Sequence, residues 1–175
     1  MEQNEPNNTA LRLEELSKSA FEIADHQPDI TGWDILDSAG YDIGEVHDLI
    51  FDKETRKVRY IVSNVHFEVE ENSRLVLIPI GIVTLHEKED EVIISELSAS
   101  YLPTLPVYKT GTVISPAEEL AIRYAFLGKK GLETSTEDPY VNHQADFYAH
   151  EHFNENNFRR RLGHDRDTTS EEHQL

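Results

Sequence analysis

The chain has no cysteine among its 175 residues. This absence excludes disulfides, thiolate metal sites, iron–sulfur clusters and cysteine nucleophiles. No apolar run approaches the roughly 18 residues that cross a bilayer, so we expect no membrane insertion. The opening stretch, MEQNEPNNTA, has neither the basic nor the apolar region of a secretory signal, which favours a cytoplasmic location.

Basic residues are also scarce, with 16 lysines and arginines against 34 aspartates and glutamates and a net charge of −18. A surface this acidic repels phosphate backbones and anionic lipids, so we expect no nucleic-acid partner. The one basic cluster, Arg159–Arg161, is flanked by Glu155, Asp165 and Asp167. That pattern favours a local contact over a nucleic-acid site.

Sequence motifs for catalysis are missing as well. The glycines are scattered as turn glycines and form no phosphate loop, and no serine lies in a nucleophile-elbow context. Asp48 and Asp52 could serve as a hydrolase pair only if they faced each other across a cleft. In a chain this acidic, a structural or solvated role is favoured for both. We therefore expect no catalytic residue, no cofactor and no enzymatic activity.

Histidines in the carboxy-terminal part raise a metal hypothesis. His150 and His152 are two residues apart, so their imidazoles would converge on a strand and diverge on a helix. No spacing matches a helical His-Glu-x-x-His arrangement, which favours ordinary surface histidines. A metal-sensing or small-ligand-sensing domain that uses this histidine- and aromatic-rich segment stays open as the alternative function.

Residues 33–97 indicate a series of short strands. Apolar runs at 33–36, 46–52, 58–65, 74–78, 82–86 and 92–96 are separated by polar turns. Gly40 closes one of these turns, and Pro79 ends the fourth run because proline removes a backbone donor. Several short strands at close spacing predict a mainly β fold, a small bent antiparallel barrel.

The apolar pattern of these strands does not alternate. Val46 and Ile50 share one face of their strand, while Leu49 and Phe51 share the other. A barrel with a solvated exterior would show clean alternation, so the outer surface should be covered too. The cover could be the carboxy-terminal segment or a second copy of the chain. For this reason we expect a homodimer.

The stretch 115-SPAEELAIRYAFLG-128 predicts a helix over 116–127. Ser115 is suited to the N-cap, Pro116 to the first helical position and Glu118 to a capping box, with Gly128 as the C′ residue. An apolar stripe should dock this short helix on the barrel or on a partner subunit. The stripe comprises Leu120, Ala121, Tyr124 and Leu127.

The chain therefore divides into four predicted parts. Residues 1–10 and 163–175 have the composition of disordered ends, 11–97 form the barrel with an amino-terminal extension, and 98–162 form a linker and helical extension. The linker includes 102–106, which should be extended and packed on the barrel. Aromatic residues in the helical extension indicate docking, and the interface candidates are Leu120, Tyr124, Leu127, Phe147 and Phe153.

The run 40-GYDIGEVHDLIFD-52, followed by 57-KVRYIV-62 and 76-VLIP-79, resembles the signature of the PRC-barrel family. The resemblance covers residues 30–97. The chain as a whole is similar to stand-alone bacterial PRC-barrel proteins, which are related to the cytoplasmic domain of the photosynthetic reaction centre H subunit. It implies a protein-binding or assembly module with no catalytic residues, whose partner is an unidentified protein or a second copy. The matched residues have fold roles: Gly40, Gly44, Val46, Asp48, Asp52, Tyr60 and Pro79.

Overall fold

The computed structural model describes residues 12–67, 70–134, 147–149, 151–154 and 156. The two segments predicted to be disordered, 1–10 and 163–175, lie outside the described residues.

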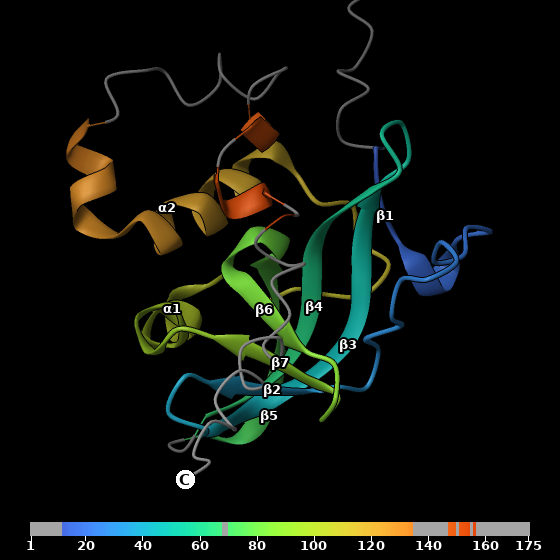
Figure 1. Ribbon diagram of the computed structural model, residues 1–175. Helices are drawn as coiled ribbons and strands as arrows, with labels where there is room; N and C mark the ends of the chain where they lie inside the picture. Colours follow the sequence, from blue (N-terminus) through green and yellow to red (C-terminus); the bar gives the residue numbers. More distant parts are fainter. Residues whose placement is uncertain (1–11, 68–69, 135–146, 150, 155, 157–175) are drawn as a thin grey trace, which may run out of the picture.

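Seven strands form one strongly bent sheet (Figure 1). Along the sheet the order is β5-β4-β3-β2-β7-β6, and β1 pairs with β3 beside β2. All pairs are antiparallel except β2 with β7, and within the described residues no ladder joins β5 to β6, so the sheet is mixed and not closed. The strands are β1 (Leu13–Glu15), β2 (Asp34–Asp37), β3 (Asp42–Asp52), β4 (Lys57–Phe67), β5 (Glu70–Pro79), β6 (Val83–His86) and β7 (Glu91–Ile94).

The mainly β barrel prediction is confirmed, with two refinements. All six predicted strands are present, and β5 ends at Pro79 as expected. The exclusively antiparallel expectation is wrong at β2–β7, because β7 returns alongside β2 in the same direction. The amino-terminal extension contributes β1 and a single 3-10 turn over Leu16–Lys18.

At Gly44, β3 lies close to the backbone of its neighbour β4. A Cβ atom placed on Gly44 would lie 2.0 Å from the backbone carbonyl oxygen of Asn64, and the φ of Gly44 is +156°. No side chain fits there, since the clash is with backbone rather than with a movable side chain. Gly40, with a φ of +89°, closes the β2–β3 turn and donates its N–H to the carbonyl of Asp37 at 2.9 Å.

The central strands are buried on both faces. Ile50 and Phe51 are consecutive in β3 and both buried, and the same is true of Tyr60 and Ile61 in β4. The cover comes from the chain itself: the Phe21 ring lies 5.0 Å from that of Phe51, and the Phe153 ring lies 5.3 Å from that of Tyr60. The described carboxy-terminal segment is thus one part of the cover, and residues 16–30 are the other part.

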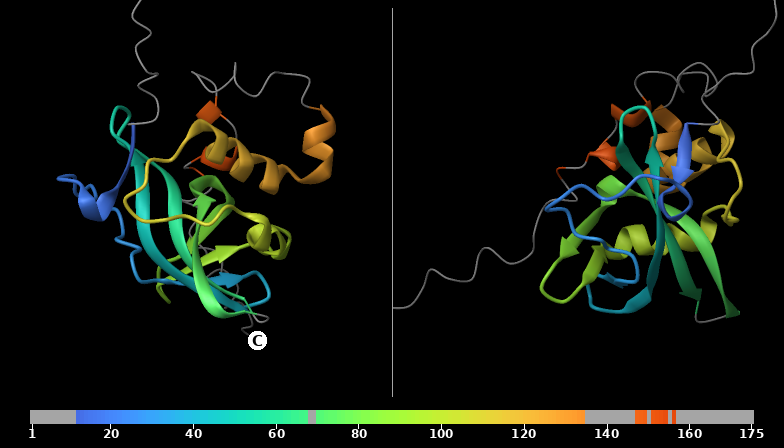
Figure 2. Two further views of the ribbon diagram at one scale, coloured as in Figure 1. Left: turned by 180° about the vertical axis from the view of Figure 1, so that it is seen from behind. Right: turned by 90° about the vertical axis from the view of Figure 1, so that its right-hand side faces the viewer.

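Two α-helices follow the sheet, α1 (Glu96–Tyr101) and α2 (Pro116–Thr134). The sequence analysis missed α1, although Ser95 caps it by accepting the backbone N–H of Ser98 at 3.1 Å. The expected extended linker is a 3-10 turn over Leu102–Thr104, followed by chain that crosses the strands (Figure 2). It packs on the barrel as predicted, because the N–H of Tyr108 donates to the carbonyl of Leu75 at 2.8 Å.

The capping box of α2 is confirmed. The backbone N–H of Glu118 donates to Ser115 Oγ at 3.2 Å, and the N–H of Ser115 donates back to Glu118 Oε2 at 2.8 Å. The predicted end at Gly128 is wrong, because the helix continues to Thr134.

The predicted apolar stripe of α2 is also displaced. The buried residues of α2 are Glu119, Ile122 and Phe126, whereas Ala121 is exposed and Leu120 and Tyr124 are half-buried. The side chain of Leu127 lies outside the described residues. The buried side of the helix is turned towards Glu119, which accepts hydrogen bonds from the hydroxyl of Tyr60 in β4 and from that of Tyr148 in the carboxy-terminal segment.

Replacement of Gly44 by alanine tests the close approach of β3 and β4. We expect Gly44→Ala to lower the free energy of unfolding by roughly 1–3 kcal/mol through overpacking. Gly40→Ala is the control, because Gly40 also has a positive φ but no atom lies within 4 Å of the added Cβ. Urea denaturation of both variants measures the difference. Equal losses would contradict the assigned backbone contact.

Candidate functional site

A buried ionic cluster anchors the amino-terminal segment to the β3–β4 hairpin. Asp52, fully buried at the end of β3, accepts from Arg12 Nε at 2.9 Å and from Arg12 Nη2 at 2.6 Å. Arg59 Nη2 lies 3.5 Å from the same carboxylate, and the N–H of Glu54 donates to it at 3.0 Å. Burial alone would raise the pKa of Asp52, but hydrogen bonds from Arg12 and Thr55 outweigh it and hold the pKa well below its usual range.

Asp48 has a separate set of donors. Its carboxylate accepts from the N–H of Leu49 at 2.7 Å, and from the N–H and hydroxyl of Ser17 at 3.2 and 2.5 Å. Asp48 and Asp52 thus each hold the amino-terminal segment through their own donors. This arrangement agrees with the structural role predicted for both.

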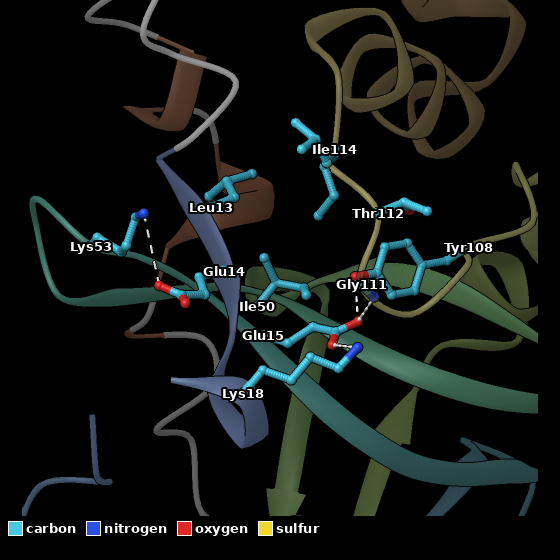
Figure 3. A pocket seen from close by; sticks show the side chains of 11 residues that line it. Leu13, Glu14, Glu15, Lys18, Ile50, Lys53, Tyr108, Gly111, Thr112 and Ile114 are labelled. Atoms are coloured by element: carbon cyan, nitrogen blue, oxygen red, sulfur yellow. Dashed lines mark hydrogen bonds and ion pairs between the residues drawn. The ribbon is translucent and has the colours of Figure 1, made fainter. Parts of the chain in front are cut away.

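A third buried carboxylate, Glu15 of β1, fastens the linker between α1 and α2 (Figure 3). Glu15 Oε1 accepts from the hydroxyl of Tyr108 at 2.6 Å and from the N–H of Gly111 at 2.9 Å, while Lys18 Nζ lies 2.5 Å from Oε2. Burial opposes the ionisation of Glu15, but the hydrogen bonds from Lys18 and Tyr108 outweigh it and lower the pKa. These groups border a pocket of about 250 Å³.

The fourth buried carboxylate is Glu119 of α2. Its Oε1 accepts from the hydroxyls of Tyr60 at 2.8 Å and Tyr148 at 2.5 Å. The guanidinium carbon of Arg59 lies 4.2 Å from the centre of the Tyr148 ring. Burial, and next the charge of Glu119, raise the pKa of both tyrosines, so both hydroxyls stay protonated and act as donors.

Two of the interface candidates are buried against the protein's own barrel. Phe147 and Phe153, in 3-10 turns over Phe147–Ala149 and Glu151–Phe153, form an aromatic cluster with Tyr60 and Tyr148. Beneath them lies Gly81, where an added Cβ would be 2.4 Å from the carbonyl oxygen of Glu151. No local sequence pattern points to the roles of Gly81 and Glu119, because their partners are distant in the chain.

The proposed metal pair is not assembled in the described residues. His150 lies outside them, and His152 is buried with its ring 6.2 Å from that of Phe126. In the described ranges, no group of three or more histidine, aspartate or glutamate side chains is placed to hold a metal ion.

A largely apolar groove lies on one face of the β3–β4 hairpin. The strap, residues 16–30, runs along β3 and the β3–β4 hairpin, and the space between them has a volume of about 550 Å³. We call this space the strap groove. Its lining residues are Leu16, Phe21, Glu22, Ile23, Ala24, Gln27, Pro28, Ile30, Leu49, Phe51, Thr55, Arg56, Lys57, Val58 and Ile80.

Comparison with known proteins identifies the fold. Residues 23–100 match the family model of the PRC-barrel domain, so the chain contains a PRC-barrel domain. The match spans the second half of the strap, β2 to β7 and most of α1. No curated protein matches the chain. In the part of the chain that the structure describes, no helix is both long and apolar enough to cross a membrane.

The pH dependence of stability tests the Asp52 cluster. Because the pKa of Asp52 is depressed in the folded state, its contribution is present above the unfolded value of about 3.9 and lost as the pH falls further. We expect Asp52→Asn to cost roughly 2–3 kcal/mol at pH 7, and the difference from wild type to shrink below about pH 4. Urea denaturation at several pH values between about 2 and about 7 measures this difference in the free energy of unfolding. The exposed residue Asp34 supplies the control, Asp34→Asn. A difference that stays constant with pH would contradict the ionic role.

The carboxy-terminal cover can be tested at Gly81. We expect Gly81→Val to displace the turn over Glu151–Phe153, since its side chain would occupy the space of that backbone. Amide hydrogen exchange should then become faster at residues 151–154, with little change in the centre of β3 and β4. Gly32→Ala is the control, because no atom lies within 4 Å of its added Cβ. Unchanged exchange at 151–154 would show that these residues do not dock there.

Proposed function

We propose that this protein is a non-enzymatic protein-binding or assembly module of the cytoplasm, and that it binds its partner in the strap groove. One observation carries the proposal. The groove is a large apolar hollow on the outside of a PRC-barrel, with the half-exposed ring of Phe21 at its mouth. Exposed apolar surface of this kind commonly marks an interaction site.

A binding role also accounts for the buried ionisable groups. Asp52, Glu15 and Glu119 each accept hydrogen bonds that hold one chain segment on another. A catalytic acid or base would instead need access to a substrate, with a pKa near the working pH. The pKa of Asp52 and Tyr148 is displaced away from that range. These contacts support a scaffold rather than an enzyme.

The partner we propose first is another protein, and second is another copy of this chain. The homodimer expectation rested on strands that are apolar on both faces, and the chain's own segments cover Phe51 and Tyr60. What still supports self-association is the groove and exposed apolar side chains elsewhere, Tyr41 and Leu97. The net charge of −18 continues to favour a protein over a nucleic acid.

Site-specific photo-crosslinking tests the proposed contact surface. The chain has no cysteine, so Ala24→Cys in the groove gives a single attachment point for benzophenone-maleimide. Ala117→Cys, exposed on α2, is the matched control. After irradiation in extract of the native cell, we expect a covalent adduct with one protein from Ala24→Cys and not from Ala117→Cys.

The mass of the adduct separates the two partners. An adduct of twice the 20.1 kDa chain mass, confirmed by sedimentation of the unmodified protein, would assign the groove to a homodimer. An adduct from Ala117→Cys alone would place the contact elsewhere and contradict the groove. No adduct from either position would contradict a protein partner at the groove.

A further inference from the structure

We infer that the strap groove takes an extended segment of a partner protein in which apolar side chains are followed by a carboxylate. This inference rests on the proposed function and names the chemistry of the partner. Three features of the groove carry it: a deep apolar floor, two cations at one end, and unpaired backbone along one wall.

The floor of the groove suits apolar side chains. Ile30, Leu49, Phe51 and Ile80 are buried beneath it, and Ile23 and Val58 are half-buried at its walls. Its volume of about 550 Å³ falls within the roughly 300–1,000 Å³ of pockets that enclose largely apolar ligands. A polar or phosphate-rich partner would bury its polar groups against this apolar floor without hydrogen-bond partners, which is unfavourable.

The charge at the groove opposes the charge of the whole protein. Among the described residues, the charged side chains that line it are Arg56, Lys57 and Glu22, all exposed, so cations outnumber anions in this lining. The rest of the chain carries a large excess of acid, with a net charge of −18. Arg56 and Lys57 lie together in the β3–β4 hairpin, at one end of the apolar floor. A carboxylate next to apolar side chains is the group that complements this end.

The strap presents backbone groups to an extended partner. Phe21 to Ala24 belong to no strand, and in the described part of the chain the backbone groups of Glu22 and Ile23 bond to no other protein group. The adjacent residue Phe21 makes two polar contacts. Its N–H donates to Ser19 Oγ at 3.1 Å, and the Arg56 guanidinium lies 5.9 Å from its ring. Unpaired backbone groups can form hydrogen bonds with an extended partner segment. Alternate side chains of that segment would then point into the apolar floor of the groove.

Two labelled peptides test the inference on the full chain. The probes are fluorescein-labelled Gly-Ser-Leu-Val-Ile-Asp-Glu and its counterpart Gly-Ser-Leu-Val-Ile-Lys-Lys, titrated at physiological salt by fluorescence polarisation. We expect the acidic peptide to bind at least about tenfold more tightly, which corresponds to about 1.4 kcal/mol. Non-specific attraction to an anionic protein would favour the lysine peptide, so this preference can only come from the local cations.

Charge-reversal variants locate the preference. In Arg56→Glu/Lys57→Glu the preference should disappear or reverse, while Lys88→Glu/Lys109→Glu, with the same change of net charge at exposed sites outside the groove, should keep it. Lys57→Glu alone is a second variant, because Arg56 also contacts Phe21 and its loss could shift the strap. Equal binding of both peptides, or equal effects of the two double variants, would overturn the inference.

A third titration separates a peptide from a small amphiphile. Laurate, an apolar chain with one carboxylate, is added and followed by native mass spectrometry. Binding of laurate that depends on Lys57, with no binding of either peptide, would overturn the assignment to a partner segment. The outcome is independent of the photo-crosslinking test, since an adduct from Ala24→Cys without a peptide preference would retain the groove and reject only this partner chemistry.

Discussion

Burial of the β3–β4 pair on both of its faces is the constraint on which the rest of the structure depends. Tyr60 and Ile61 are adjacent in β4 and point to opposite faces, yet neither is exposed. Apolar side chains on both faces of a bent sheet cannot all be enclosed by the sheet itself, so further chain must pack on them. The strap supplies this cover near Phe51, and the segment around Phe153 supplies it near Tyr60.

Buried charged groups determine where these covering segments lie. Apolar packing alone is non-directional, whereas a buried carboxylate is stable only where its donors are placed to meet it. Asp52 holds the residues before β1 through Arg12, and Glu119 joins α2 to both Tyr60 and Tyr148. The strap groove lies where the strap has no such buried carboxylate, since its residues after Ser19 are held by apolar packing of Phe21, Ile23 and Ile30.

Much of the fold could be predicted from the sequence, because its signals are local. The strands follow from apolar runs and turn residues, and the start of α2 from Ser115 and Glu118. The buried side of α2 could not be predicted, since Glu119 is a surface residue by type and is buried only because of distant tyrosines. The groove is hidden for the same reason: the strap and the β3–β4 hairpin are separate in sequence and adjacent only after folding.

The central claim is that a single chain covers both faces of its own β3–β4 pair. It is tested most directly by isotope-filtered nuclear Overhauser spectroscopy on an equal mixture of labelled and unlabelled full-length protein. The account predicts contacts between the rings of Tyr60 and Phe153 within one chain, consistent with their separation of 5.3 Å, and none between chains. Contacts between these rings that appear only across differently labelled chains would show that a second copy supplies the cover, and would contradict the account.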